Sequence, residues 1–431
     1  MQLFFVVLYL CLLLGIGFFS SKRTKKNRDY YIAGNNIKTP ALTLSLLATI
    51  LGSSAILGSI NLASTQGWAA SWFLLSASIG LFILVALAKY VRRFGKFTLP
   101  ELLGDFYGEK AQKLASLIIP IAWIGIIAAQ LIGASKILAS ITDIPYTFGV
   151  IISGIVIIIY TFIGGQKSII KTDGLQAILL LVGLLLLAGF IYMNLDIPIA
   201  DLTDREFPFN ENFKVWDLLI LLLTYASTFV VGPDIYSRLF CAKDEKTAQK
   251  SVFITAIVIL IFALMLSFIG VSANAMYNGI DSQTAFSFLT LVNDLLPVWL
   301  STILASTILS QPKKGKEYSI KKTRIFIVIL GILSIFLALK VTSIISSLLL
   351  ALTFFSGAFI IPVAAGLLSY RAKTSVVLTA MISGGIIALV GKLVIMFSDK
   401  SIVAYSLMIG AFIINASILF SPKVKQILNK Y

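Results

Sequence analysis

The sequence predicts an all-helical membrane protein with about thirteen transmembrane helices, ten of which form two inverted repeats of five. Three observations predict this fold. Of the 431 residues, 58% are hydrophobic and 13% are charged, which is too few charges to cover a water-soluble globule. Apolar stretches long enough to cross a bilayer recur along the chain. Two of these stretches are interrupted by small and polar residues, one in each half of the sequence.

The predicted spans begin near the N-terminus and end shortly before the C-terminus. They cover residues 3–19, 38–64, 70–90, 113–140, 146–164, 174–194, 215–234, 251–275, 294–311, 325–342, 344–369, 374–397 and 402–420. Basic residues follow the first span and none precedes it, which is the reverse of a secretory signal peptide. We therefore expect a retained first helix whose N-terminus lies outside.

Basic residues set the predicted orientation. Threading the spans from an outside N-terminus leaves 29 of the 35 Lys and Arg residues on one side of the bilayer, and the other six lie outside or within spans. Such an excess marks the cytoplasmic side, so we expect the C-terminus in the cytoplasm. The topology thus accounts for the formal charge of +16, and we expect no nucleic acid among the partners.

Several kinds of chemistry are excluded by what the chain contains. The two cysteines, Cys11 and Cys241, fall at different predicted depths, so neither a disulfide nor a thiolate metal site is expected. The sequence has no histidine, which excludes imidazole catalysis and histidine proton relays. The spans show no nucleophile with a base, no metal cluster and no paired carboxylates. We expect no enzymatic activity and no catalytic residues.

The first interruption, at residues 52–54 (Gly-Ser-Ser), lies within the otherwise apolar span 38–64. Irregular backbone at bilayer depth is tolerated only where it is buried in protein or lines a cavity, so this break is a candidate binding site. Close packing of small residues against a neighbouring helix is the alternative explanation. The second interruption lies in the span 215–234, at residues 225–228 and at Gly232-Pro233.

Five spans separate the two interruptions, and an odd number of crossings inverts the second unit relative to the first. The broken spans thus become the first and sixth core helices. The predicted segments are residues 1–37, an extra helix and a basic cytoplasmic loop; 38–194, the first repeat with core helices 1–5; 195–214, an acidic external loop; 215–369, the second repeat with core helices 6–10; and 370–431, two C-terminal helices and a cytoplasmic tail.

Five features, in order along the chain, resemble the sodium/solute symporter family. They are Asp29-Tyr30-Tyr31-Ile32-Ala33-Gly34, Gly67, Thr98-Leu99-Pro100-Glu101, the run Tyr160-Thr161-Phe162-Ile163-Gly164-Gly165 followed by Thr172-Asp173 and Gln176, and Gly232-Pro233 with Arg238. The resemblance implies a leucine-transporter-type inverted-repeat fold. It also implies secondary active transport, in which a small solute enters with sodium by alternating access.

The resemblance implies a sodium site between the first and eighth core helices. Matching at Gly58 assigns to it the backbone carbonyls of Ala48 and Leu51. The hydroxyl ligands would come from a motif similar to the family's S-T-A-D-S, namely Ser306, Thr307 and Ser310. Sodium favours hard oxygen ligands, and an interrupted helix supplies carbonyls without burying a formal charge.

Asp173 carries two interpretations. The resemblance implies that it assists sodium on the inward path or at a second ion site. Alternatively, Asp173 opens a helix at the cytoplasmic face, where a carboxylate stabilises the helix dipole.

The eighth core helix departs from the family pattern. Leu309 stands where the family motif has an acidic residue, and only about fifteen apolar residues follow Leu296-Pro297. They span roughly 22 Å, against about 30 Å for a hydrocarbon core. This short span supports an alternative function, that of an uncoupled or inactive transporter-like sensor or binding protein with a degenerate sodium site.

The solute pocket is expected to draw residues from the two broken helices and their neighbours. The candidates are Ser53, Ser54, Ala55, Trp72, Ser76, Gln130, Thr228, Gly232, Phe355 and Ser356. Packing between helices is the alternative explanation for each of them.

We expect no acidic side chain in the pocket, and half-helix N-termini favour anionic groups. The predicted solute is therefore a small neutral or anionic metabolite, such as an amino acid, a carboxylate or a sugar. The expected partners are this solute, sodium and the lipid of a bacterial inner membrane, in which a monomer suffices.

Overall fold

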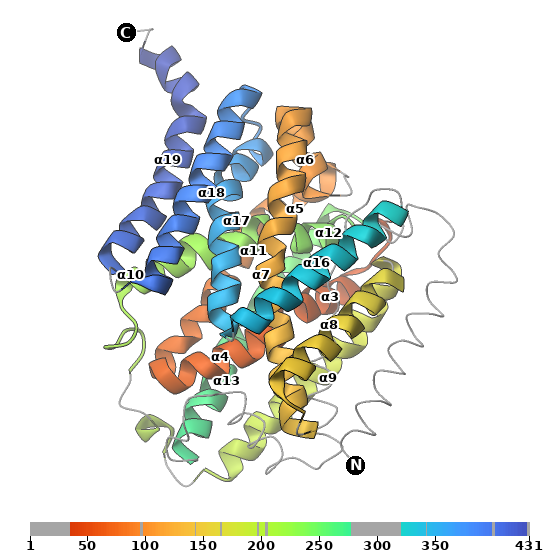
Figure 1. Cartoon of the computed structure of the whole chain (residues 1–431), viewed down its shortest axis with the longest axis vertical. Coiled ribbons are helices and arrows are strands. Elements are labelled where there is room, and N and C mark those ends of the chain that lie inside the picture. The colour runs from red at the N-terminus through yellow and green to blue at the C-terminus, as the bar shows by residue number, and fades with distance from the viewer. Residues whose placement is uncertain are drawn as a thin grey trace.

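The computed structural model describes residues 35–276, apart from 95–97, 143, 164–165, 196–197 and 203–205, and residues 320–428, apart from 342 and 399–400. The described residues are almost entirely helical (Figure 1). Eight helical stretches among them are long and apolar enough to cross a membrane. The predicted spans 3–19 and 294–311 lie outside the described residues, so the total of about thirteen spans stays a prediction.

The first predicted repeat is helical along nearly all of its described length. Its elements are α3 (Thr39–Ile50), α4 (Ser53–Gln66), the 3-10 turn η2 (Gly67–Ser71), α5 (Trp72–Phe94), α6 (Leu99–Tyr107), α7 (Glu109–Thr142), α8 (Tyr146–Ile163) and α9 (Gln166–Met193). The short helix α6 has a local cause, because the Thr98 hydroxyl accepts a hydrogen bond from the N–H of Glu101 at 3.3 Å and Pro100 lies in the first turn.

The second predicted repeat and the C-terminal helices follow the external segment. The elements are η3 (Ile199–Asp201), α10 (Val215–Leu221), the π-helical turn η4 (Leu222–Ala226), α11 (Ser227–Val231), α12 (Pro233–Leu239), α13 (Glu245–Met276), α16 (Ile320–Lys340), α17 (Ile344–Leu367), α18 (Thr374–Phe397) and α19 (Ser401–Leu428). Both interruptions are present in the structure. Gly232 is extended, with ψ 128°, between α11 and α12, and Pro233 begins α12, where its missing N–H leaves no helical bond unmade.

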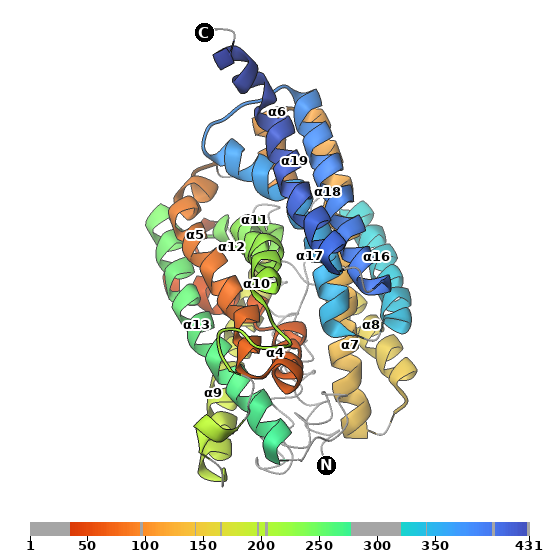
Figure 2. The ribbon, with the colours of Figure 1, turned by 90° about the vertical axis from the view of Figure 1, so that its left-hand side faces the viewer.

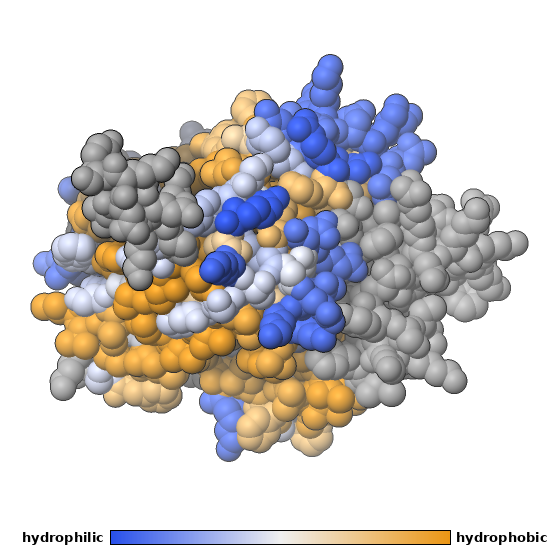
Figure 3. Space-filling model, turned by 90° about the horizontal axis from the view of Figure 1, so that it is seen from above, coloured by the Kyte–Doolittle hydropathy of each residue, from blue (hydrophilic) through white to orange (hydrophobic). Residues whose placement is uncertain are grey.

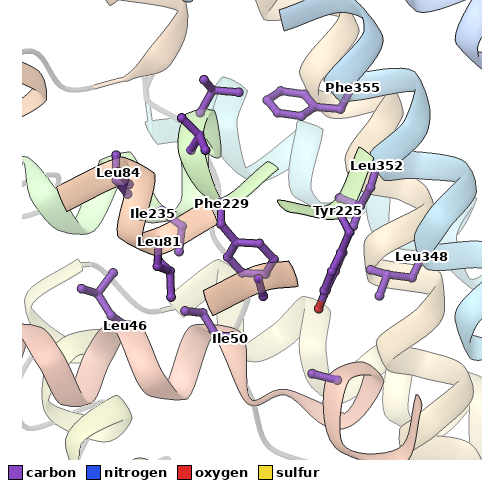
Figure 4. Close-up of a cluster of buried hydrophobic side chains, with 14 of the residues drawn as sticks. Leu46, Ile50, Leu81, Leu84, Tyr225, Phe229, Ile235, Leu348, Leu352 and Phe355 are labelled. Atoms are coloured by element: carbon purple, nitrogen blue, oxygen red, sulfur yellow. The ribbon is translucent and has the colours of Figure 1, made fainter. Parts of the chain in front are cut away.

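The described helices form two groups that lie side by side in Figure 2. In the first helix group α3, α4, α5, α9, η4 and α10–α13 pack on one another, and in the second helix group α6, α7, α8 and α16–α19 do so. Helix α17 contacts α4, α11 and η4 and so joins the two groups. Figure 4 shows that this junction is apolar, with Tyr225 and Phe229 on one side and Leu348, Leu352 and Phe355 on the other.

The π-helical turn is held against α5 by a close backbone approach. A Cβ on Gly80 would lie 2.1 Å from the carbonyl oxygen of Ala226, so only glycine permits this contact. The Tyr225 ring stacks on Phe73, with ring centroids 4.4 Å apart. The helix formed by α10, η4 and α11, which is predicted as the start of the sixth core helix, is thereby fixed within the first helix group just ahead of the break at Gly232.

The outer surface of the helices is largely apolar. Large hydrophobic side chains are exposed on many of them, including Ile83 on α5, Leu117 on α7, Phe336 on α16 and Ile413 on α19. Figure 3 shows hydrophobic residues along the edges of one end of the molecule and hydrophilic residues over its centre and one side. Because a lone exposed apolar residue is ordinary but such a continuous apolar surface is not, this surface indicates contact with lipid.

Candidate functional site

The candidate site centres on the break between α3 and α4. Helix α3 ends at Ile50, and Leu51 (ψ 53°) and Gly52 (ψ 175°) leave the helical conformation before α4 begins at Ser53. In a continuous helix the carbonyl of Ala48 would accept a bond from the N–H of Gly52, and the break ends that ladder. Ala48 and Leu51 are each 1% exposed, so the two predicted sodium carbonyls lie inside the protein.

The hydroxyl ligands predicted for the sodium site lie outside the described residues. They are Ser306, Thr307 and Ser310. Within the described residues no three carboxylate, thiol or imidazole groups cluster as a metal site. The described oxygen atoms around the break include backbone carbonyls, the hydroxyls of Ser53 and Ser54 and the amide oxygen of Gln130, which are neutral ligands of the kind that suits sodium.

Gln130 of α7 reaches into the first turn of α4. Its Oε1 accepts hydrogen bonds from the N–H of Ser54, at 3.1 Å, and from the hydroxyl of Ser53, and its Nε2 donates to the Ser54 hydroxyl at 2.8 Å. Helix α4 has Gly52 as its N-cap and so has no capping side chain of its own. Gln130 supplies the acceptor that an N-cap side chain would otherwise provide.

Gly52 makes room for this arrangement. A Cβ on Gly52 would lie 2.7 Å from Nε2 and 3.1 Å from Oε1 of Gln130. A larger residue would push the amide away from Ser53 and Ser54. The structure therefore brings together three predicted pocket residues, Gln130, Ser53 and Ser54, and shows why glycine precedes them.

Three other predicted pocket residues bond within their own helices. The hydroxyls of Ser76, Thr228 and Ser356 donate to the carbonyls of Phe73 at 2.8 Å, Thr224 at 2.7 Å and Thr353 at 3.2 Å. All three side chains are buried. Such local bonds use the hydroxyl hydrogen and leave the oxygen lone pairs for another donor.

The remaining pocket candidates are placed by packing. Trp72 holds the segment that precedes α10, because its Nε1 donates to the carbonyl of Pro208 at 3.0 Å and its ring stacks on Phe207 at 5.4 Å. Ala55 is buried in the first turn of α4, and its N–H donates to the carbonyl of Gly52 at 3.0 Å. Phe355 is fully buried, edge-on to Trp123 at 5.0 Å.

An acidic side chain lies beside Gly232, one of the predicted pocket residues. A Cβ on Gly232 would lie 2.8 Å from Oδ1 of Asp234, which is partly buried. Asp234 occupies the first turn of α12, where a carboxylate stabilises the helix dipole. The sequence contains a signal for this position. Asp234 directly follows Gly232-Pro233, so it becomes the second residue of a helix that begins at the proline.

Asp173 belongs to a buried charged cluster with Arg238 of α12 and Ser45 of α3. Its Oδ2 accepts hydrogen bonds from Arg238 Nη2 at 3.0 Å and from the Ser45 hydroxyl at 2.5 Å. Arg238 Nε donates to the carbonyl and hydroxyl oxygens of Ser45, both at 3.1 Å. The Arg238 and Asp173 side chains are 2% and 1% exposed, so the ion pair ties three helices together inside the first helix group.

The interpretation of Asp173 as a residue that opens a helix is wrong. Helix α9 begins at Gln166, so Asp173 lies two turns inside it. Both members of the ion pair fall in family-like motifs, Thr172-Asp173 and Gly232-Pro233 with Arg238. No local pattern indicates that they pair, since 65 positions separate them. Ser45 was missed for the same reason, because a serine in an apolar helix is unremarkable by itself.

Comparison with protein families identifies the chain. The model of the family described as "SSF: Sodium:solute symporter family" matches residues 30–311, which contain both breaks, Gln130 and the Asp173–Arg238 pair. The chain belongs to the sodium:solute symporter family. Membership confirms the resemblance in the motifs and supports sodium-coupled solute transport by a multi-pass membrane protein. It also places the chain among transporters and not among enzymes.

A curated relative and several solved structures are similar to this symporter. The relative is the "Uncharacterized symporter YwcA" of Bacillus subtilis (strain 168), 24% identical over 283 residues, which are 63% of this chain. The chain spans about half, 55%, of the length of that relative. A structure of a Na+-coupled sialic acid symporter, in a substrate-bound outward-open state, has a TM-score of 0.78 at 17% identity and covers 98% of this chain and 97% of its own.

Two further structures share the fold more distantly. The inward-facing conformation of Mhp1 has a TM-score of 0.58 at 12% identity, with 94% of this chain and 95% of that chain covered. A manganese transporter of Eremococcus coleocola has a TM-score of 0.56 at 11% identity, with 93% and 96% covered. At these identities the likeness shows the fold alone.

Proposed function

We propose that this symporter is a secondary active transporter that couples entry of a small neutral or anionic metabolite to sodium by alternating access. The observation that carries the proposal is the break between α3 and α4. Helix α3 ends among the buried residues Ala48 and Leu51, and the start of α4 presents N–H and hydroxyl donors at Ser53 and Ser54. Carbonyl ends of helices attract cations and N–H ends attract acceptors, so one break serves both ion and solute.

In this proposal sodium binds the carbonyls of Ala48 and Leu51 together with hydroxyls from the eighth core helix. The residues that would supply them are Ser306, Thr307 and Ser310. Asp173 would assist sodium on the inward path or at a second ion site, and its carboxylate is held in place for this by Arg238 and Ser45. The N-terminus would lie outside and the C-terminus in the cytoplasm of a bacterial inner membrane.

The solute would contact the first turn of α4 with its hydrogen-bond acceptors. An amino acid, a carboxylate or a sugar carries such acceptors. The other proposed lining residues are Ala55, Trp72, Ser76, Gln130, Thr228, Gly232, Phe355 and Ser356. The free lone pairs of the Ser76, Thr228 and Ser356 hydroxyls would receive donors from the solute.

Uptake into proteoliposomes tests the proposed function. Purified protein is reconstituted and offered a panel of radiolabelled metabolites, with an inward sodium gradient or with potassium replacing sodium. We expect concentrative uptake of at least one neutral or anionic solute that depends on sodium. Uptake that ignores sodium, or binding without uptake, would instead support the uncoupled sensor or binding protein that Leu309 and the short eighth span suggest.

The ion ligands have a separate test. Replacing the two hydroxyls together, Ser306→Ala with Thr307→Ala, removes two proposed sodium ligands while the break at Gly52 remains. We expect the sodium concentration for half-maximal uptake to rise about tenfold, which corresponds to about 1.4 kcal/mol of lost ion binding, with solute affinity at saturating sodium unchanged. An unchanged sodium half-saturation would remove both residues from the ion site.

A further inference from the structure

Two kinds of contact join the first and second helix groups near the break. Around α17 the contacts are apolar, between Tyr225 and Phe229 on the first group and Leu348, Leu352 and Phe355 on the second. At Gln130 the contact is polar, because α7 of the second group bonds α4 of the first. Both contacts lie near the broken helix, since α4 packs on both α7 and α17.

The two contacts respond differently to relative movement of the groups. Burial of apolar surface is non-directional, so an apolar junction tolerates sliding with little change in free energy. Hydrogen bonds weaken steeply away from their preferred distance and angle. The Gln130 amide makes bonds to Ser53 and Ser54 with both of its ends, so it fixes one register of α4 against α7.

The hydrogen bonds between Gln130 and the serines Ser53 and Ser54 can be exchanged for bonds to other partners. Gln130 is partly exposed, whereas Ser53 and Ser54 are 2% and 4% exposed, so the two serines are more deeply buried than the residue that bonds them. If the amide withdraws, the Ser53 hydroxyl still reaches the backbone carbonyl of Gln130, at 3.3 Å, but the Ser54 N–H needs another acceptor, because a buried donor left unpaired costs about 1–3 kcal/mol. Under the proposed function that acceptor is the solute or water.

We propose that Gln130 is a positioning residue of the transport cycle, a hydrogen-bonded link that holds α4 to the second helix group and must open and re-form as the groups move. This inference rests on the proposed function and deepens it. It predicts that the link has an intermediate strength. A stronger link slows turnover, and an absent link lowers the apparent affinity for the solute by leaving α4 unheld.

Two substitutions move the strength of the link in opposite directions. Gln130→Glu keeps the shape and the acceptor oxygen. It replaces the Nε2 donor by a second acceptor, to which the Ser54 hydroxyl can donate, and it adds a negative charge at the positive end of α4, so the bonds tighten. We expect kcat to fall at least tenfold with KM changed less than threefold. Gln130→Ala removes every side-chain bond of the link, and we expect KM to rise about tenfold with a smaller change in kcat.

A glutamine elsewhere in the chain provides the matched control. Gln249 of α13 donates from Nε2 to the carbonyl of Val85 at 3.2 Å, which is a bond between two helices of the same group. Gln249→Ala and Gln249→Glu are expected to lower the thermal unfolding midpoint without splitting kcat from KM. A purely structural role for Gln130 would give the same pattern as Gln249.

A distance measurement tests the link without any knowledge of the solute. Spin labels are placed at Thr65 on α4 and at Phe148 on α8, both exposed, in a chain with Cys11→Ser and Cys241→Ala. Pulsed electron resonance in nanodiscs then records the distance between the two helix groups in sodium and in potassium. We expect two populations that shift with sodium in the native background, one population in Gln130→Glu, and a broadened distribution in Gln130→Ala.

The outcomes separate this inference from the proposed function. A sodium-dependent shift that both Gln130 variants reproduce would overturn the link and leave sodium coupling standing. A single distance that ignores sodium in the native background would contradict both. Variants that change the distance distribution while the Gln249 controls do not would establish Gln130 as the link.

Discussion

Gln130 and Arg238 each place a polar side chain against the broken helix made of α3 and α4. Gln130 contacts the part after the break and Arg238 the part before it. Gln130 is neutral, comes from the second helix group and bonds the first turn of α4. Arg238 is charged, belongs to the first group and bonds Ser45 in α3 and Asp173 in α9. One cluster therefore crosses between the groups, whereas the other lies inside one of them.

The chemistry of each cluster suits its place. A neutral hydrogen bond contributes about 0.5–1.5 kcal/mol net and can be exchanged for a bond to solute or water. A buried ion pair that loses one partner costs about 3–5 kcal/mol, so its members stay together. The comparison indicates that α3, α9 and α12 stay together as one unit. Helix α4, in contrast, can exchange its bond to Gln130 of α7 for a bond to solute or water.

Arg238→Met is expected to have the largest effect of the substitutions considered. It removes the three hydrogen bonds that the guanidinium donates to Ser45 and Asp173, and it leaves the Asp173 carboxylate, at 1% exposure, without this cation. We expect a loss of about 3–5 kcal/mol in the free energy of unfolding. The measurements are the thermal unfolding midpoint in detergent and the yield of monodisperse protein. A midpoint equal to that of the native protein would show that the ion pair does not hold the group together.

A double substitution sharpens this result. Arg238→Met with Asp173→Leu removes both charges and keeps similar volumes, and replacing a buried ion pair by apolar residues is often close to neutral. We expect the double variant to be more stable than Arg238→Met alone, measured by the same midpoint. Additive losses in the double variant would argue that the two side chains are not energetically coupled. The double variant is expected to have weakened sodium dependence if Asp173 assists the ion.

The interruptions could be predicted from the sequence because the residues that break a helix are local. Glycine and proline weaken a helix through their own backbones, and both breaks lie where they were expected, at Leu51–Gly52 and at Gly232. Membership of the family, carried by short motifs, could be predicted for the same reason. The inverted relation between the two halves and the full number of spans remain predictions.

The partners of the polar side chains could not be predicted, because they depend on which helices meet. Gln130 was a pocket candidate, yet nothing in its neighbourhood in the sequence indicates that its amide caps α4, 76 positions away. Asp173 was misread as the first residue of a helix because the polar residues before it look like a loop, whereas the helix begins at Gln166. Pairing with Arg238 and Ser45 is what allows a carboxylate inside that helix.

The same substitution in both clusters compares them directly. Ser45→Ala removes a hydroxyl that donates to the buried carboxylate of Asp173, and Ser53→Ala removes one that donates to the neutral amide of Gln130. We expect a loss of about 1.5–3 kcal/mol for Ser45→Ala and about 0.5–1.5 kcal/mol for Ser53→Ala, measured by thermal unfolding. For transport the order reverses, with the larger rise in the solute KM in Ser53→Ala. Equal effects on KM would remove the distinction between the two clusters.

Tyr405→Phe is expected to have the smallest effect. It tests whether any hydrogen bond between the two helix groups affects transport, or only the bonds of Gln130. The Tyr405 hydroxyl of α19 donates to Asp217 of α10, so this bond also joins the second group to the first. Both residues are partly exposed, and Asp217 keeps its bond from the Lys214 N–H, at 2.9 Å, so the start of α10 stays capped without the tyrosine hydroxyl. We expect a loss of about 0–1 kcal/mol and uptake kinetics within twofold of the native protein.

The contrast with Gln130 depends on where each bond lies and on what can replace it. Water can take the place of the Tyr405 hydroxyl at Asp217, because the site is partly exposed, so opening this bond has little cost in any conformation. The Ser54 N–H is buried, so opening the Gln130 link requires a substitute acceptor for it in the interior. If Tyr405→Phe altered kcat as strongly as Gln130→Glu, any bond between the groups would control turnover, and the break would have no special part in it.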